Sequence, residues 1–295
     1  MKLLLASICF VLSATAFALP PQPTDPNHPG SATYDYGVSH EKLKIMGRDV
    51  DVFLPRAGAF ERESFPVVVF GHGQAIKVDG YEMTFEHLAK RGIAVIHPMY
   101  DSGFFDRKWR RMAADYNQLV DAVLQRYEQL NPEQLIYAGH SKGAYIALMA
   151  AGAPNLKVVP KSLVLFAPAG MDDDYINKLD KNTAVSIIYG EADSIIGRDL
   201  IDRIYKLAPV ERKQLLIVNS YSGLSADHYI PLNRSYIFGG RDGIGAFHYH
   251  GVWKWLMGAA WDVQEGARAS NSFLYGEDAL SSGDSNVRHE IFRSW

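Results

Sequence analysis

The sequence contains a single cysteine, no excess of basic charge, and no clear membrane-spanning segment. That residue, Cys9, lies in an N-terminal stretch that we expect to be removed, so the mature chain should have no disulfide. The 30 basic and 33 acidic side chains give a formal charge of −3, which argues against a nucleic-acid partner. No internal repeat is present. With 295 residues, of which 47% are apolar, the chain is large enough to bury one core.

The first 18 residues have the pattern of a secretory signal peptide. Lys2 precedes an apolar centre, and the stretch ends in small residues up to Ala18. The apolar part is short for a transmembrane helix, and prolines follow at once, so no stable membrane anchor is expected. Ile8 is too large for the position before a lipoprotein cysteine. We therefore predict cleavage after Ala18 and export to the periplasm or the extracellular space.

The proline-rich residues 19–33 should form neither helix nor strand, because proline lacks a backbone donor and fixes φ. We interpret them as a spacer. At the other end, residues 266–295 are polar and serine-rich, and no role is predicted for this tail.

Between these ends, in residues 34–265, strand and helix patterns alternate. This order predicts an α/β domain with a mostly parallel sheet and helices on both faces, where ligands bind outside the carboxyl ends of the strands. Predicted strands are a half-buried one at residues 50–55, a central one at 66–70 and buried ones at 93–97, 135–138, 162–166, 184–189 and 214–218; helices are predicted at 83–91, 109–130 and in the segment after residue 250.

A Gly-His-Ser-Lys-Gly pentapeptide at residues 139–143 follows one of these strands and precedes a helical pattern. A G-x-S-x-G sequence in this setting is typical of a nucleophile elbow, in which the serine hydroxyl projects above the sheet. The alternative is an ordinary glycine-rich loop. The pattern favours Ser141 as a nucleophile.

A serine nucleophile needs a base, and the base needs an acid that orients it. In the order typical of such elbows, both follow the serine, acid first. Asp193, just after a strand, is the favoured acid, and His228, in the loop after the next strand, is the favoured base. The open alternatives are Glu191 and Asp172, Asp173 and Asp174 for the acid, and His248, His250 and His289 for the base.

Acyl transfer also needs backbone N–H donors for the developing oxyanion. The strand at residues 66–70 leads into Gly-His-Gly-Gln at 71–74, at the same edge of the sheet as Ser141. We expect the donors to be the N–H groups of Gln74 and Lys142. The side chains of His72 and Lys142 need no chemical role: His72 would brace the loop, and Lys142 would be a solvated residue of the first helical turn.

These motifs, namely Phe-Gly-His-Gly at 70–73, the pentapeptide at 139–143, Gly-Glu-Ala-Asp at 190–193 and Asp-His-Tyr-Ile-Pro at 227–231, together resemble the α/β-hydrolase superfamily over residues 45–262. Within it the chain looks most like the branch of dienelactone hydrolases, chlorophyllases, platelet-activating-factor acetylhydrolases and bacterial polyester hydrolases. Dienelactone hydrolases use a cysteine nucleophile, whereas this chain has Ser141. The resemblance implies a carboxylic ester hydrolase that acts on a small or lipid-like ester without a cofactor or metal.

Three further patterns have weaker functional interpretations. His248 and His250 could form a metal pair in an extended segment, but aromatic surface at the start of a closing helix is favoured. The basic residues 107–111 are expected on a solvated helix face, with an anionic substrate as the alternative. The long, glycine- and aromatic-rich segment 230–250 is expected to form one wall of the substrate cleft, with core packing as the alternative.

The sequence therefore predicts a secreted serine esterase. An amidase, peptidase or acyltransferase could use the same groups, and a binding protein could retain the scaffold without turnover. The acyl chain, the alcohol and the oligomeric state are not determined by these patterns.

Overall fold

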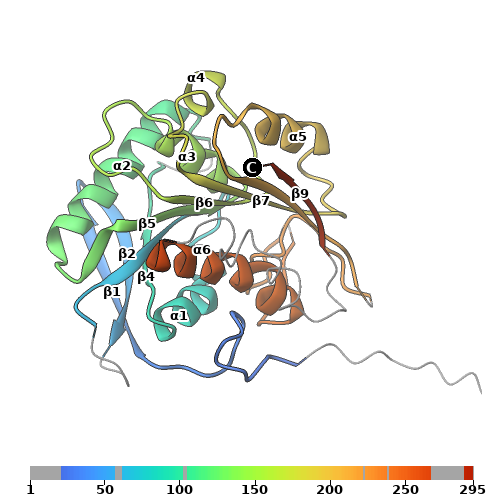
Figure 1. The fold of residues 1–295 in the computed structure, drawn as a ribbon, viewed down its shortest axis with the longest axis horizontal. Coiled ribbons are helices and arrows are strands. Elements are labelled where there is room, and N and C mark those ends of the chain that lie inside the picture. Colours follow the sequence, from blue (N-terminus) through green and yellow to red (C-terminus); the bar gives the residue numbers. More distant parts are fainter. Residues whose placement is uncertain are drawn as a thin grey trace, which may run out of the picture.

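A nine-stranded, mostly parallel sheet forms the centre of the structure, a computed structural model that describes residues 21–56, 62–101, 105–221, 223–237, 239–266 and 289–294 (Figure 1). The strand order is β1-β2-β4-β3-β5-β6-β7-β8-β9. Strands β4, β3, β5, β6, β7 and β8 run parallel, whereas β1, β2 and β9 join by antiparallel pairing. The strands are β1 Gly37–Ile45, β2 Arg48–Arg56, β3 Phe65–Gly71, β4 Ala94–Pro98, β5 Leu130–His140, β6 Ser162–Phe166, β7 Ala184–Gly190, β8 Lys213–Val218 and β9 His289–Ser294.

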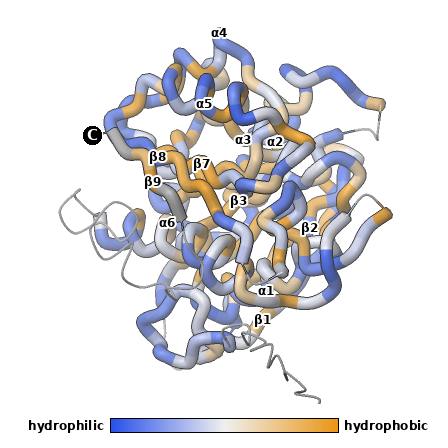
Figure 2. The backbone as a smooth tube through the Cα atoms, turned by 90° about the vertical axis from the view of Figure 1, so that its right-hand side faces the viewer, coloured by the Kyte–Doolittle hydropathy of each residue, from blue (hydrophilic) through white to orange (hydrophobic). Residues whose placement is uncertain are grey.

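Helices cover both faces of this sheet, as the alternating pattern predicts. Helices α2, α3, α4 and α5 share one hydrophobic core with one face, and α1 and α6 share a second core with the other (Figure 1). The apolar character of the central strands is visible along β7 and β8 (Figure 2). The helices are η1 Val78–Gly80, α1 Glu82–Lys90, α2 Trp109–Arg126, α3 Lys142–Ala151, α4 Asp173–Ile176, α5 Arg198–Leu207, η2 Phe247–Val252 and α6 Trp253–Glu265.

Strand β2 differs from its sequence prediction, because residues 50–55 are buried on both faces rather than on one. Val50 and Val52 enter one core, while Phe53 enters the other against Phe85 of α1, with ring centroids 5.4 Å apart. The polar residue of the strand, Asp51, is buried with its carboxylate 2.7 Å from the His40 ring. The alternation of apolar and polar residues along the strand did not predict the second buried face. Helix α1, which covers that face, comes from another part of the chain.

Helix α2 confirms the helical spacing seen in the sequence. Its inward residues, including Met112, Tyr116 and Val123, are fully buried. The helix ends at Arg126, short of the predicted residue 130, because Tyr127 is extended and Leu130 already begins β5.

The two ends of the chain are more integrated than the sequence suggested. Residues 21–33 form no helix or strand, as predicted, but they are hydrogen-bonded to α1 and its C-cap. The His87 ring lies 2.9 Å from the Pro29 carbonyl oxygen, and Arg91 donates to the carbonyls of Pro26 and Thr33. The sequence suggested only a spacer here, whereas the structure places these residues in contact with the domain. At the other end, β9 extends the sheet beside β8, giving the last part of the tail a structural place.

The predicted signal peptide at residues 1–18 lies outside the described residues. Among the helices that the structure does describe, none combines the length and apolarity needed to cross a membrane.

Candidate active site

Ser141 occupies a strained turn between β5 and α3, with φ of 55° and ψ of −118°. Glycine is required around it by close backbone contact: a Cβ on Gly143 would lie 2.0 Å from the Gly71 carbonyl oxygen, and one on Gly139 would lie 2.5 Å from the Gly143 carbonyl carbon. The turn is fixed by a hydrogen bond of 2.8 Å from the Ser141 N–H to the Phe166 carbonyl. This is the local geometry expected of a nucleophile elbow.

His228 and Asp193 meet in the loops after β8 and β7. The Nδ1 atom of His228 lies 2.8 Å from Asp193 Oδ2, and both side chains are buried. The other carboxylate oxygen, Oδ1, accepts from the N–H groups of Ile195 and Ile196, at 2.8 and 3.0 Å. Burial alone would raise the pKa of Asp193, but the hydrogen bond and charge of His228 and the two backbone donors lower it below the usual value. Asp193 is thus a fixed, charged acceptor for His228.

The competing acids do not contact His228. Asp172 and Asp174 pair with Arg110, and Asp173 pairs with Arg203 around the short helix α4. Glu191 is exposed at the start of the loop that carries Asp193. The structure brings Asp193, and neither Glu191 nor the 172–174 cluster, to His228.

The competing histidines also lie elsewhere. His248 and His250 lie in η2, at the start of the closing helix as expected, but they are buried there, so the expectation of a surface position is wrong. His289 begins β9, where it pairs with Val218. Within the described residues, no group of three His, Cys, Asp or Glu side chains is placed to hold a metal ion.

A cavity of about 210 Å³ opens where four strand-end loops converge, after β3, β5, β7 and β8. Both Ser141 and His228 line it, as does Gln74, and its walls are largely aliphatic and aromatic. No hydrogen bond joins the Ser141 hydroxyl to the His228 ring among the described residues, and such contacts often tighten only when substrate binds. The lining residues are Gly73, Gln74, Ile76, His140, Ser141, Ile195, His228 and Tyr229.

The two residues expected to supply oxyanion donors follow different strands. Gln74 follows β3 in the cavity wall, and Lys142 is the first residue of α3, where backbone N–H groups are not used within the helix. The Lys142 side chain corrects the prediction of a solvated residue: it is 3% exposed, and its Nζ forms an ion pair with Asp101. Trp109 stands beside it, with Nζ 5.8 Å from the ring centroid.

His72 braces the loop after β3, as expected. Its Nδ1 donates to the Gly73 carbonyl at 2.9 Å, and its ring stacks on Tyr100 at 4.5 Å between centroids. Burial lowers the pKa of His72 below its usual value, so the ring is a neutral structural group.

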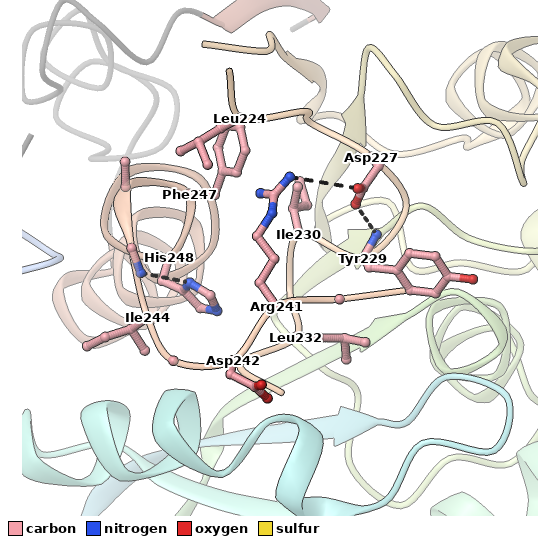
Figure 3. Close-up of a pocket in the computed structure, with 14 residues that line it drawn as sticks. Leu224, Asp227, Tyr229, Ile230, Leu232, Arg241, Asp242, Ile244, Phe247 and His248 are labelled. Atoms are coloured by element: carbon pink, nitrogen blue, oxygen red, sulfur yellow. Dashed lines mark hydrogen bonds and ion pairs between the residues drawn. The ribbon is translucent and has the colours of Figure 1, made fainter. Parts of the chain in front are cut away.

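A second cavity of about 180 Å³ lies beside the first and is formed by residues 224–248 (Figure 3). Arg241 and Asp227 approach to 4.0 Å across it, and His248 points into it with Nδ1 accepting from Gly245 N–H at 3.2 Å. Tyr229 lines both cavities. Segment 230–250 therefore lines a neighbouring cavity rather than that of Ser141; its Phe238 lies outside the described residues.

The basic cluster at 107–111 is a helix start held by ion pairs. Arg110 binds Asp172 and Asp174, and Arg111 binds Asp106 and Asp115. These partners favour the interpretation as a solvated, charge-paired face over that as a site for an anionic substrate.

Three residues near the site have no signal in the local pattern. Asp101 follows β4 and neutralises Lys142, Tyr81 begins the turn into α1, and His140 is the variable position of the pentapeptide. Because each acts through a partner far along the chain, periodicity and motif spacing cannot find it.

No family model matches this chain, and no curated protein matches it significantly. The functional argument therefore depends on the geometry of these residues.

Proposed function

We propose that this protein is an exported serine hydrolase of the α/β-hydrolase superfamily that cleaves carboxylic esters. One observation carries the proposal: His228, paired at 2.8 Å with the buried Asp193, lines the same cavity as a serine in a strained strand-to-helix turn. The chain order of serine, acid and histidine, and the loop after β3 beside the serine, are further support.

The reaction follows from the roles of these groups. Ser141 Oγ attacks the ester carbonyl while Nε2 of His228 takes the hydroxyl proton, and Asp193 holds the ring through Nδ1 and stabilises its charged form. The N–H groups of Gln74 and Lys142 stabilise the oxyanion. His228 then protonates the departing alcohol, and a water molecule, deprotonated by the same ring, releases the acid from the acyl-enzyme.

The cavity walls favour an uncharged acyl or alkyl group next to the serine. Ile76, Ile195 and Tyr229 provide apolar surface, and the described lining contains no lysine or arginine that would select a charged substrate. This favours an ester of apolar character, while an amidase, peptidase or acyltransferase remains the rival that uses the same groups.

A fluorophosphonate probe and a series of p-nitrophenyl esters test the proposal on the chain beginning at Leu19. The wild type should be labelled and should hydrolyse esters, whereas Ser141→Ala should do neither while keeping its circular dichroism spectrum. In subtilisin, loss of the serine nucleophile lowers kcat by about 10⁶, and a loss on that scale is expected here. Amides and alcohol acceptors assayed in parallel separate the rival activities.

Failure of the folded wild type to react with the probe would reject a serine hydrolase and favour a binding protein on this scaffold. Labelling of Ser141→Ala at the wild-type rate would move the nucleophile to another residue.

A further inference from the structure

Hydrogen bonds through two buried side chains connect the loop after β3 to the peptide of His228. The Gly73 N–H donates to Tyr81 Oη at 2.9 Å, and Oη lies 2.9 Å from His140 Nδ1. The other ring nitrogen of His140, Nε2, lies 2.8 Å from the His228 carbonyl oxygen. The connection thus runs from the proposed oxyanion side of the cavity to its base side.

The chemistry of the end groups fixes every proton in this series. The Gly73 N–H can only donate and the His228 carbonyl can only accept. Because the His228 carbonyl can only accept, Nε2 of His140 must carry a proton, and in the neutral ring Nδ1 is then unprotonated. The Tyr81 hydroxyl therefore donates to Nδ1, while its oxygen accepts from the Gly73 N–H. One neutral tautomer of His140 satisfies all three bonds.

The surroundings maintain this neutral arrangement. Tyr81 and His140 are 0% and 1% exposed. Burial, followed by the proximity of His228, lowers the pKa of His140 to about 3, and burial raises the pKa of Tyr81 above its usual range. Neither side chain changes charge near neutral pH, so the hydrogen bonds keep their direction.

Packing also limits the movement of Tyr81 and of the loop that rests on it. The Tyr81 ring contacts Phe70 of β3 and Phe85 of α1, with centroids 4.9 and 5.9 Å away. Gly73 approaches so closely that a Cβ there would lie 3.0 Å from His140 Nδ1 and 3.1 Å from Tyr81 Oη. The loop, the tyrosine and the histidine are therefore positioned by direct contact.

We propose that Tyr81 and His140 are positioning residues that hold the His228 peptide in register with the loop after β3. The proposal rests on the function proposed above, in which His228 is the base and Gln74 in that loop supplies an oxyanion donor. His228 is then fixed at two points, its ring by Asp193 and its carbonyl by His140. Since His140 immediately precedes Ser141, one residue links the nucleophile turn to the base.

Tyr81→Phe tests this role by removing only the phenolic oxygen from the series. We expect kcat for a short p-nitrophenyl ester to fall about 10- to 100-fold, the scale of a small misplacement of reacting groups, with KM within about twofold. His140→Gln should give a similar loss. The double variant should lose no more than the worse single variant, because either change interrupts the same series.

Tyr116→Phe is the matched control. Tyr116 is equally buried and donates to the Val69 carbonyl at 2.9 Å in β3, so Tyr116→Phe also loses one tyrosine hydrogen bond, but Tyr116 is not one of the residues that line the cavity. Its kcat should equal that of the wild type after correction for folded fraction. Equal kcat in Tyr81→Phe and Tyr116→Phe would overturn the positioning role.

Nuclear magnetic resonance of ¹⁵N-labelled histidine gives a readout independent of turnover. His140 should be the Nε2-protonated neutral tautomer from about pH 5 to 8, and the His228 ring signals should shift in Tyr81→Phe but not in Tyr116→Phe. An Nδ1-protonated His140, or unmoved His228 signals, would overturn the proposal. If the wild type is inactive, the proposed function fails while these spectra still decide whether the series of bonds exists.

Discussion

The two neighbouring cavities are built in opposite ways. Four separate loops, each at the carboxyl end of a parallel strand, form the cavity of Ser141, whereas residues 224–248 alone form the cavity beside it. The first is constrained by the sheet and by hydrogen bonds between its loops. The second comes from a single stretch of chain, the loop after β8 and the first residues of η2, and its lining includes several glycines.

This difference separates chemistry from recognition within the proposed function. Reacting groups must keep their mutual distances, and the strand ends of a sheet provide that rigidity. A single loop can change in shape and length without moving those groups. Changes in the first cavity should therefore affect turnover, and changes in the second should affect preference.

Each cavity is lined by a histidine that distinguishes the two, His228 in the first and His248 in the second, and substituting them should give the largest difference in turnover. His228→Ala should nearly abolish turnover, by a factor approaching the 10⁶ or so seen for the subtilisin triad, because the proposed acceptor of the serine proton is removed. His248→Ala should leave kcat close to that of the wild type, since His248 lines only the second cavity. Steady-state kinetics with one short ester measure both. The reverse order would reassign the base to η2.

The acid should show the next largest effect. Asp193→Asn should lower kcat by up to about 10⁴, as the equivalent change does in a serine protease, with a small change in KM, because the acid orients the base without touching substrate. Asp172→Asn is the control, since Asp172 pairs with Arg110 away from the cavity. A comparable kcat loss in Asp172→Asn would contradict the assignment of Asp193 as the acid that orients His228.

Tyr229 should produce a smaller and selective effect, because it is the residue shared by both cavities. Its ring packs on Gly239, where a Cβ would lie 2.3 Å from it, and edge-on to His228 at 5.3 Å. Tyr229→Ala should raise the ratio of kcat/KM for long over short acyl esters by a factor on the order of 10. The ratio removes any general loss of turnover.

Tyr236 lines neither cavity, so Tyr236→Ala should leave the ratio of kcat/KM for long over short acyl esters unchanged. Deletion of residues 239–245 in a folded variant should also change chain-length preference while sparing attack on an acetyl ester. If chain-length preference were unchanged in both Tyr229→Ala and the deletion, segment 230–250 would serve core packing and not substrate selection.

The pH dependence of stability should show the smallest effect. Burial lowers the pKa of His97 and His140 to about 3 and that of His248 to about 4, whereas an unfolded histidine takes up a proton near pH 6.5. The unfolded chain therefore binds more protons below about pH 6.5, and the folded state loses about 1.4 kcal/mol per pH unit for each such histidine. This stability is fully present above that pH.

Urea unfolding between about pH 6.5 and 4.5 measures this slope. His248→Gln should reduce it by about 1.4 kcal/mol per pH unit, because one neutral buried histidine is removed. An unchanged slope would mean that His248 can be protonated in the folded state over this range.

The sequence by itself determined the central strands, several of the helices and the order in which the site residues appear. Continuous apolar runs located the central strands, the spacing of apolar residues located α2, and the glycines at 139 and 143 marked a turn that no larger residue could make. These features are local, since each depends on backbone geometry and burial within a few residues. Parallel strand ends then had to bring Ser141, Asp193 and His228 to one edge.

Only the tertiary structure decided which side chains meet there. Whether Asp193 or Glu191 contacts His228 depends on the direction of loop side chains, and the burial of Lys142 depends on Asp101 after a different strand. The link from His140 to His228 spans 88 residues, so neither residue's neighbours in sequence reveal it. Within segment 230–250, residues 247–250 form part of η2 and pack in the second core with α6, and other residues line a separate cavity. The conformation of a loop depends on packing between residues far apart in the sequence, and the local spacing of apolar residues does not reveal those contacts.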